Sequence, residues 1–185
     1  IEALAVAAVA AAVPAQDLPF VFKPAGEVAV AMEASLGIAI GPDDRLYVTG
    51  SQGLRVLAPE GRVVMELQTA EPVRCVAVDA DGTMYLGVLN KVEKRDPTGK
   101  LLAVWGAERK MLTNSHITGI AIHGALIAAA DAGSRKVRLF AADGDPVDEL
   151  EGFVIPSPYF DCAFGPDGVL YVTHTGARRV ELYDA

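Results

Sequence analysis

Short apolar runs interrupted by turn residues recur along most of the chain. The last copy, residues 160–185, has apolar runs at 162–164, 169–173 and 180–183, separated by GPDG at 165–168 and by a small polar loop at 174–178. Proline presets φ at the second position of a tight turn, and glycine tolerates the positive φ that such a turn needs. The runs are rich in branched and aromatic residues suited to sheets. The pattern therefore predicts three strands of an antiparallel meander.

A central alanine marks the first run of each copy. It occurs at Ala39, Ala77, Ala121 and Ala163, with spacings of 38, 44 and 42 residues. A second glycine-containing turn follows at 58–61, 96–99 and 141–144, and a fourth apolar run comes after it. Four short strands in a period near forty residues are typical of a propeller blade. The sequence thus predicts an all-β fold, a β-propeller of four-stranded antiparallel blades.

The repeat also sets the expected blade boundaries. We expect the propeller over residues 16–185, with blades at 34–71, 72–115, 116–158 and 159–185, the last truncated. Residues 20–28 match the end of the first blade, with Pro24 against Pro59 and Gly26 against Gly61, and predict a half blade at 18–33. In closed propellers a split blade removes the exposed sheet edges at the chain ends. We therefore expect a fragment with an incomplete ring of about four blades plus an N-terminal half blade.

An alanine- and valine-rich run, LAVAAVAAAV at 4–13, precedes the repeats and is followed by Pro14, Ala15 and polar Gln16. This pattern is typical of a cleavable secretory signal. A buried helix or the remainder of a membrane anchor are the alternatives, although the run is too short to span a bilayer. We expect residues 1–15 to be a signal peptide remnant. The mature domain is then exported to the periplasm or the extracellular space, without membrane insertion.

Composition narrows the class of protein. The chain of 185 residues is 51% hydrophobic and 22% charged, which predicts one folded domain. Its net charge of -8 argues against nucleic acid and anionic membranes as partners. The two cysteines, Cys75 and Cys162, lie two blades apart at positions expected on opposite sheet faces, so we expect free buried thiols.

Residues 120–144 and 162–183 resemble the NHL repeat, whose pattern combines an apolar strand, a Pro-Asp-Gly turn, a second strand, a small polar loop and a base before valine. Trp105-Gly106 is similar to the Trp-Gly that often ends such a repeat, whereas His123-Gly124 departs from the pattern as a shortened turn. The tryptophan-aspartate repeat is disfavoured because glycine follows Trp105. The resemblance implies a six-bladed propeller and a family that ranges from interaction modules to metal-dependent lyases.

In a four-stranded meander, the loop between strands two and three lies at the same rim as the start of strand one. Propellers commonly bind ligands at that rim, and we expect a protein or small-molecule ligand there. Asp161 lies just before a first strand at this rim, and His123 falls at the opposite rim. The predicted ligand-binding residues are Arg74, Asn90, His116, Asp131, Tyr159 and His174.

A basic residue precedes the third strand of every blade, at Arg55, Lys91, Lys136 and Arg179. One interpretation is a cationic ring that grips an anionic ligand. The other is that each base pairs with a nearby carboxylate or packs its aliphatic part on the next blade.

No catalytic motif stands out. The three histidines lack metal-ligand spacing, and no nucleophilic triad, phosphate-binding loop or pair of catalytic carboxylates is evident. We therefore expect a binding or scaffold module that needs no cofactor. The alternative is a metal-dependent hydrolase or lyase resembling the gluconolactonase-like propellers, which implies a divalent metal. Its nearest candidate ligands are Glu33, Asn90 and Asp131, although Glu33 lacks the Glu-Gly-Pro context of that family.

Overall fold

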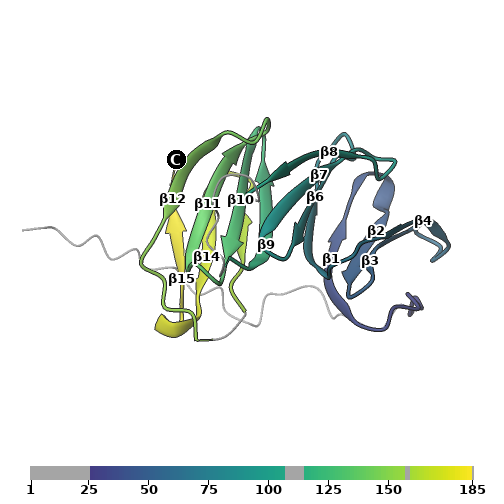
Figure 1. Cartoon of the computed structure of the whole chain (residues 1–185), viewed down its shortest axis with the longest axis horizontal. Coiled ribbons are helices and arrows are strands. Elements are labelled where there is room, and N and C mark those ends of the chain that lie inside the picture. Colours follow the sequence, from purple (N-terminus) through teal and green to yellow (C-terminus); the bar gives the residue numbers. More distant parts are fainter. Residues whose placement is uncertain (1–25, 107–114, 157–158, 185) are drawn as a thin grey trace, which may run out of the picture.

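The computed structural model describes residues 26–106, 115–156 and 159–184, and these residues form an all-β fold of antiparallel sheets placed side by side (Figure 1). Three sheets have four strands and one has three, each in sequential order. This confirms the predicted incomplete β-propeller, whose ring is not closed. The strands of the first two blades are β1 (Ser35–Ile40), β2 (Leu46–Gly50), β3 (Gly53–Leu57), β4 (Val63–Gln68), β5 (Val73–Val78), β6 (Met84–Val88), β7 (Lys91–Arg95) and β8 (Leu101–Trp105). Those of the next two are β9 (Ile117–His123), β10 (Leu126–Asp131), β11 (Lys136–Ala141), β12 (Pro146–Leu150), β13 (Cys162–Phe164), β14 (Leu170–His174) and β15 (Arg179–Tyr183).

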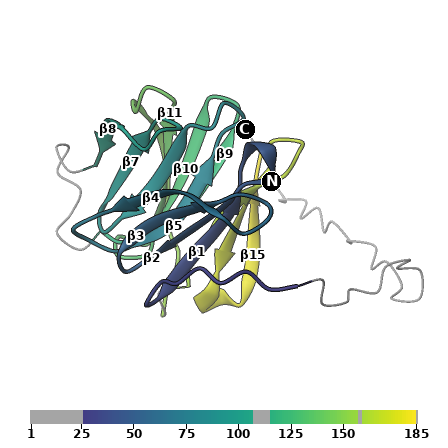
Figure 2. The same ribbon diagram turned by 90° about the vertical axis from the view of Figure 1, so that its right-hand side faces the viewer.

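The first strand of each blade lies beside the first strand of the next. β1 packs against β5, β5 against β9, and β9 against β13, so the four first strands gather on the inner side (Figure 2). The fourth strands, β4, β8 and β12, form the outer edges of their sheets. Residues at the start of the first strands are thereby brought together from all four blades.

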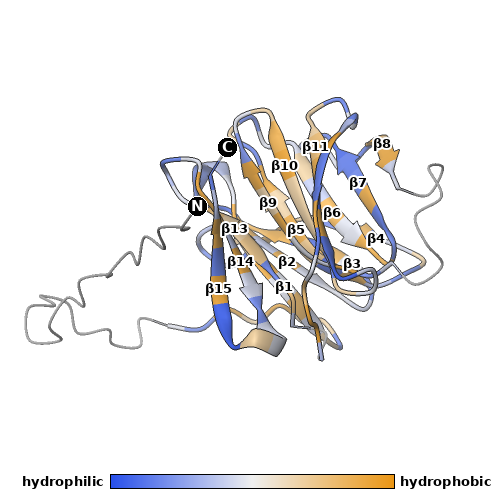
Figure 3. Ribbon diagram, turned by 90° about the vertical axis from the view of Figure 1, so that its left-hand side faces the viewer, coloured by the Kyte–Doolittle hydropathy of each residue, from blue (hydrophilic) through white to orange (hydrophobic). Residues whose placement is uncertain are grey.

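The hydrophobic core lies between neighbouring sheets, and the central strands of the second and third blades are covered on both faces. In β6, Met84 and Leu86 pack toward the first blade, while Tyr85 packs toward the third. In β10, Ile127 contacts the second blade and Ala128 the fourth. This two-sided burial explains why the central strands read as continuous apolar runs, which Figure 3 shows in orange along β9 and β10.

The predicted turn glycines adopt the backbone conformation that the pattern requires. Gly61, Gly99 and Gly144 have φ of +86°, +88° and +94°, at the turn between the third and fourth strands of their blades. Two short 3₁₀ turns connect strands: Pro42–Asp44 (η2) lies between β1 and β2, and Thr175–Ala177 (η3) lies between β14 and β15.

The expected signal peptide at 1–15 and the first part, 18–25, of the expected half blade at 18–33 lie outside the described residues. Residues 26–34 form no strand. They are held to the first blade by Arg55 of β3, whose guanidinium donates to the Val30 carbonyl at 2.6 Å. The Ser51 amide donates to the Ala34 carbonyl at 3.2 Å. Within the described ranges, no helix has the length and hydropathy needed to cross a membrane.

Both cysteines are free and buried, as the sequence predicts. Cys75 packs in the core between the second and third blades, and Cys162 in the core between the third and fourth. Burial raises the pKa of both thiols above the ordinary value, which keeps them protonated and unreactive.

Candidate functional site

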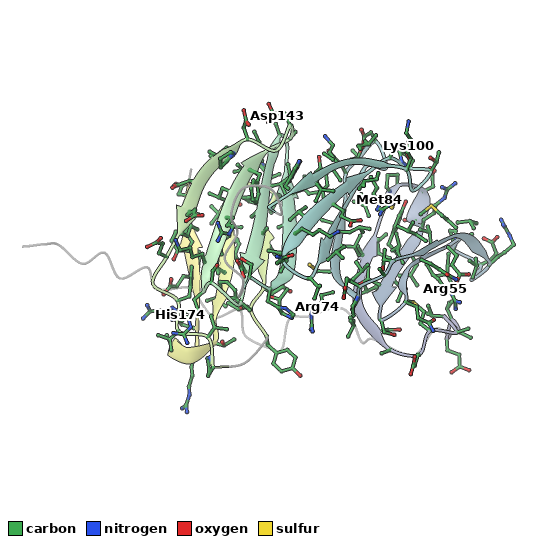
Figure 4. The ribbon with its side chains drawn as sticks, in the orientation of Figure 1. Arg55, Arg74, Met84, Lys100, Asp143 and His174 are labelled. Atoms are coloured by element: carbon green, nitrogen blue, oxygen red, sulfur yellow. The ribbon has the colours of Figure 1, made fainter. Side chains whose placement is uncertain are left out.

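The meander places the six predicted ligand-binding residues at one rim. Figure 4 shows the separation of the rims: Arg74 and His174 lie at the lower edge, and Asp143 and Lys100, from turns between third and fourth strands, lie at the upper edge. Sharing a rim does not make these residues equivalent, because their hydrogen bonds differ. Two of them are fully engaged in structural networks.

Asp131 holds the loop after β10 and the segment before β9. The side chain is 0% exposed, and its Oδ2 accepts the hydroxyls of Ser115 and Ser134, both at 2.6 Å. Its Oδ1 accepts the backbone amides of His116 at 2.7 Å and of Gly133 and Ser134 at 3.1 Å. Burial acts to raise the pKa of Asp131, but these hydrogen bonds outweigh it and lower the pKa below its ordinary value. Asp131 is therefore a structural acceptor with no oxygen left for a ligand.

His174 is likewise held inside the fourth blade. It is 5% exposed, its Nε2 accepts the Val154 amide at 2.8 Å, and its Nδ1 lies 2.8 Å from Oε1 of Glu181. These partners fix the neutral tautomer with the proton on Nδ1. The imidazole also contacts the Phe153 ring edge-on, with centroids 5.3 Å apart. Both ring nitrogens are occupied, so His174 is positioned to support the blade.

The bases expected before the third strands lie at or near the starts of those strands and are paired with carboxylates. Arg55 lies 3.1 Å from Glu66, and Arg179 lies 2.5 Å from Glu181. Lys91 and Lys136 each have a carboxylate at 2.8 Å, from Glu93 and Glu149 respectively. Of the two interpretations of these bases, the structure supports the paired one, and they form no cationic ring.

A different set of side chains surrounds a hollow where the four first strands meet. Each of β1, β5 and β9 contains a β-bulge near its start, and the extra residues are Leu36, Arg74 and Thr118. A bulge redirects a side chain out of the regular alternation, and bulges are common beside functional sites. The hollow has a volume of about 320 Å³ and is lined by Leu36, Gly37, Ile38, Arg74, Cys75, Val76, Thr118, Ile120, Asp161 and Cys162. We call it the inner-rim pocket.

Arg74 supplies the positive charge of the inner-rim pocket. Its Nε is buried and has no hydrogen-bond partner, and its guanidinium forms no ion pair with any described residue. The pKa of neighbouring His116 is lowered, mainly by desolvation and also by the positive charge of Arg74. The negative charge of Asp131 opposes this shift but does not outweigh it. His116 is therefore a neutral neighbour of an unpaired arginine.

Asp161 supplies the negative charge on another wall. Its Oδ1 accepts the Cys162 amide at 2.9 Å, and no described residue donates to its Oδ2. The carboxylate lies against Gly119, where an added Cβ would collide with Oδ1. The surrounding protein displaces part of its hydration water, and this desolvation raises the pKa of Asp161. Thr118, between the two charges, is occupied because its hydroxyl donates to the Phe160 carbonyl at 2.5 Å.

The structure thus brings Arg74 and His116 together, with Asp131 bonded to the His116 amide as part of the loop network. The other predicted residues lie elsewhere along the rim. Tyr159 is 79% exposed just before β13, and Asn90 lies in the tight turn between β6 and β7. Sequence reasoning placed Asp161 at this rim but missed Thr118 and the close packing at Gly119. The bulges that redirect Leu36, Arg74 and Thr118 have no distinct signature in a single sequence.

A larger hollow of about 410 Å³ lies on the outer side, between β8, β11 and β12. Trp105 and Phe140 line it, and the charged Arg138 is already paired with Glu149 at 2.5 Å. The indole Nε1 of Trp105 is buried against Gly144. The cationic side chain of the outer hollow is thus already engaged, whereas Arg74 of the inner-rim pocket forms no ion pair with a described residue.

The residues expected for a divalent metal do not fit one. A cation at Asp131 would have to displace the hydroxyl and amide donors that occupy both carboxylate oxygens. Within the described ranges, no group of three or more His, Cys, Asp or Glu side chains converges as a metal site would require.

Comparisons with known proteins show the fold of the chain but not its function. No family model matches the sequence, and no curated protein matches it. Among solved structures, a streptogramin B lyase is 20% identical over 82% of this chain and 55% of its own, with a TM-score of 0.64. The WD40 β-propeller domain of Doa1 is 14% identical over 81% of this chain and 50% of its own, with a TM-score of 0.66. The computationally designed Ika4 protein is 13% identical over 85% of this chain and 94% of its own, with a TM-score of 0.65.

These similarities identify the fold. The chain is a β-propeller. It spans about half the length of the lyase and of the WD40 domain. Since one of these structures is a lyase and the other a WD40 domain, fold similarity does not distinguish an enzyme from an interaction module.

Proposed function

We propose that this β-propeller is a binding module that holds a small-molecule or peptide ligand in the inner-rim pocket. The observation that carries the proposal is Arg74, whose Nε is buried without a partner while the bases before the third strands are paired. Burying a charged donor without a hydrogen bond is costly, so such a group requires an explanation. A ligand that accepts from this guanidinium supplies one.

The concave shape of the pocket favours a ligand over a purely structural role. Four blades contribute to one hollow, with an apolar wall from Leu36 and Ile38 and a few polar groups that converge on it. Apolar walls with few placed polar groups are typical of ligand sites in proteins. No nucleophile with an activating base is present among the lining residues, which supports binding rather than catalysis.

A fragment screen followed by amide NMR tests this proposal. We expect bound fragments to shift the amide resonances of Arg74, Cys75, Gly119 and Cys162, which lie along three first strands. Shifts that cluster at the opposite rim, in the turns at 41–45 and 79–82, would contradict it, and so would the absence of any binding fragment.

We further propose that the complete ring is an exported NHL-type propeller with six blades. The supporting features are the recurring offsets of the repeat and the alanine- and valine-rich run at 4–13. Mass spectrometry of protein recovered outside the cytoplasm tests the export. A mature N-terminus at Gln16 is expected, and retention of residues 4–13 on the exported protein would contradict the signal assignment.

A further inference from the structure

The inner-rim pocket carries two charged side chains of opposite sign on different blades, and neither forms an ion pair with a described residue. Arg74 comes from β5 in the second blade, and Asp161 directly precedes β13 in the fourth. They are not ion-paired with each other, since no salt bridge joins them, and the third blade lies between. A pocket that holds separated opposite charges complements a ligand that has an anionic group and a cationic group at a distance.

The other walls of the pocket favour a ligand with an apolar body. Leu36 and Ile38 of the first blade are 45% and 69% exposed, and both face the pocket, as does buried Ile120 of the third blade. The Thr118 hydroxyl donates to the Phe160 carbonyl, so it does not donate to a ligand. The body of the ligand therefore contacts aliphatic side chains, and its polar groups lie at its ends.

The position of the carboxylate is fixed by the backbone. Gly119 leaves the space that Asp161 occupies, and the Cys162 amide holds Oδ1, so that Oδ2 is the atom available to a donor. An amine offers both the charge and the hydrogen bonds for this oxygen. A carboxylate offers the matching pair of acceptors for a guanidinium, which binds such groups in a bidentate manner.

We propose that the inner-rim pocket binds a short apolar peptide as its zwitterion, with the free carboxylate on Arg74, the free amino group on Asp161 and the aliphatic side chains on Leu36 and Ile38. This assignment rests on the binding function proposed above and adds the class of ligand. It follows from the chemistry of the two charges and the aliphatic wall. Capture of chain termini by fixed charges and backbone groups is an established mode of peptide recognition.

Calorimetric titration with leucine and its linear dimer and trimer tests the proposal, because the three probes share chemistry and differ in the separation of their charges. We expect one length to bind best. For that length, an N-acetylated and a C-amidated form remove one charge each, and each should weaken binding by about tenfold or more, since a charge-assisted hydrogen bond contributes about 1.5–3 kcal/mol.

Two variants assign each charge to its residue. Arg74→Gln should abolish the preference for the free carboxylate and keep that for the free amine, while Asp161→Asn should do the reverse. Arg74→Lys, which keeps the charge, should retain a reduced carboxylate preference. Arg45→Gln, at an exposed arginine of the opposite rim, serves as the matched control and should leave all affinities unchanged. Melting temperatures of the variants report whether they fold.

The outcomes distinguish an error in the proposed ligand class from an error in the proposed binding site. If fragments shift the pocket amides but capped and free peptides bind alike, the zwitterion assignment is wrong and the binding site remains. If Arg74→Gln folds and keeps the carboxylate preference, the assignment of Arg74 is overturned. If neither fragments nor peptides shift the pocket amides, both proposals fail.

Discussion

The carboxylate of Asp131 shows how this chain uses buried charge. Its two oxygens accept hydrogen bonds from Ser115, His116, Gly133 and Ser134, which come from the segment before β9 and the loop after β10. Each bond also satisfies a loop donor that water would otherwise have to reach. Asp131 thus replaces solvent as the acceptor of the loop, and this explains its complete burial.

We predict that Asp131→Asn lowers the free energy of unfolding by about 2–4 kcal/mol, because the amide presents N–H donors to groups that are themselves donors. Urea unfolding followed by circular dichroism measures the change. Asp143→Asn, in an exposed turn at the opposite rim, is the control and should alter stability by less than about 0.5 kcal/mol. Equal effects of the two substitutions would contradict the structural role of Asp131.

Glu181 makes the fourth blade sensitive to acid. The Tyr183 hydroxyl, His174 and Arg179 all donate to its carboxylate, and these hydrogen bonds lower the pKa of Glu181 from 4.5 to about 2. A depressed pKa stabilises the folded state above the unfolded pKa, and the effect is lost as pH falls through the folded pKa.

Glu181→Gln should therefore destabilise the protein most at neutral pH, and its penalty should shrink as pH falls from about 4.5 toward about 2. Chemical unfolding of the wild type and the variant at a series of pH values measures this difference. Glu60→Gln, whose exposed carboxylate lies 3.3 Å from Arg62, is the control and should show little penalty at any pH. A penalty for Glu181→Gln that stays constant with pH would argue against the network.

At the scale of elements, the contact between neighbouring blades depends on side chains that cross from one sheet to the next. Trp105, at the end of β8, lies 5.5 Å from the rings of both Tyr85 in its own blade and Phe140 in the next. The turn that contains Gly144 covers the indole from the third blade, and an added Cβ there would collide with Nε1. Gly144 is thus required both for its φ of +94° and for the approach of two blades.

Gly144→Ala is predicted to destabilise the chain by about 2–4 kcal/mol, through the left-handed backbone and the overpacking of Trp105. Trp105 is the only tryptophan, so its fluorescence reports the site directly, and we expect a shifted emission maximum in the folded variant. Gly152→Ala is the matched control, since Gly152 has a φ of +93° with nothing within 4 Å. It should cost only the backbone strain, about 1–2 kcal/mol, with unchanged emission. The prediction fails if both variants behave alike.

At the scale of the whole molecule, the open ring leaves the outward faces of its terminal blades uncovered. Ile40 of β1 is 63% exposed, and Val180 and Leu182 of β15 are 52% and 60% exposed. Equivalent faces inside the ring are buried against a neighbour, as Ile127 is at 0%. The stability of the chain therefore comes from its internal interfaces.

We expect Ile127→Thr to lower the free energy of unfolding by about 2–4 kcal/mol, since it removes buried methyl groups and buries a hydroxyl. Ile40→Thr, the same change on an uncovered face, should be within about 0.5 kcal/mol of the wild type. Thermal or urea unfolding distinguishes them. A large loss for Ile40→Thr would show that its face is covered in solution.

The sequence by itself determined the strands, the turns and the propeller blades of this protein. These features depend on alternation along one strand and on turn residues such as Gly61 and Gly99, and both act between residues close in sequence. The tertiary structure decided which residues of the rim are available, because hydrogen-bond partners come from other blades. It placed Asp131 and His174 in structural networks and left Arg74 and Asp161 unpaired across the third blade. The repeat pattern could predict that rim, but only the packing of bulged first strands set the chemistry of its pocket.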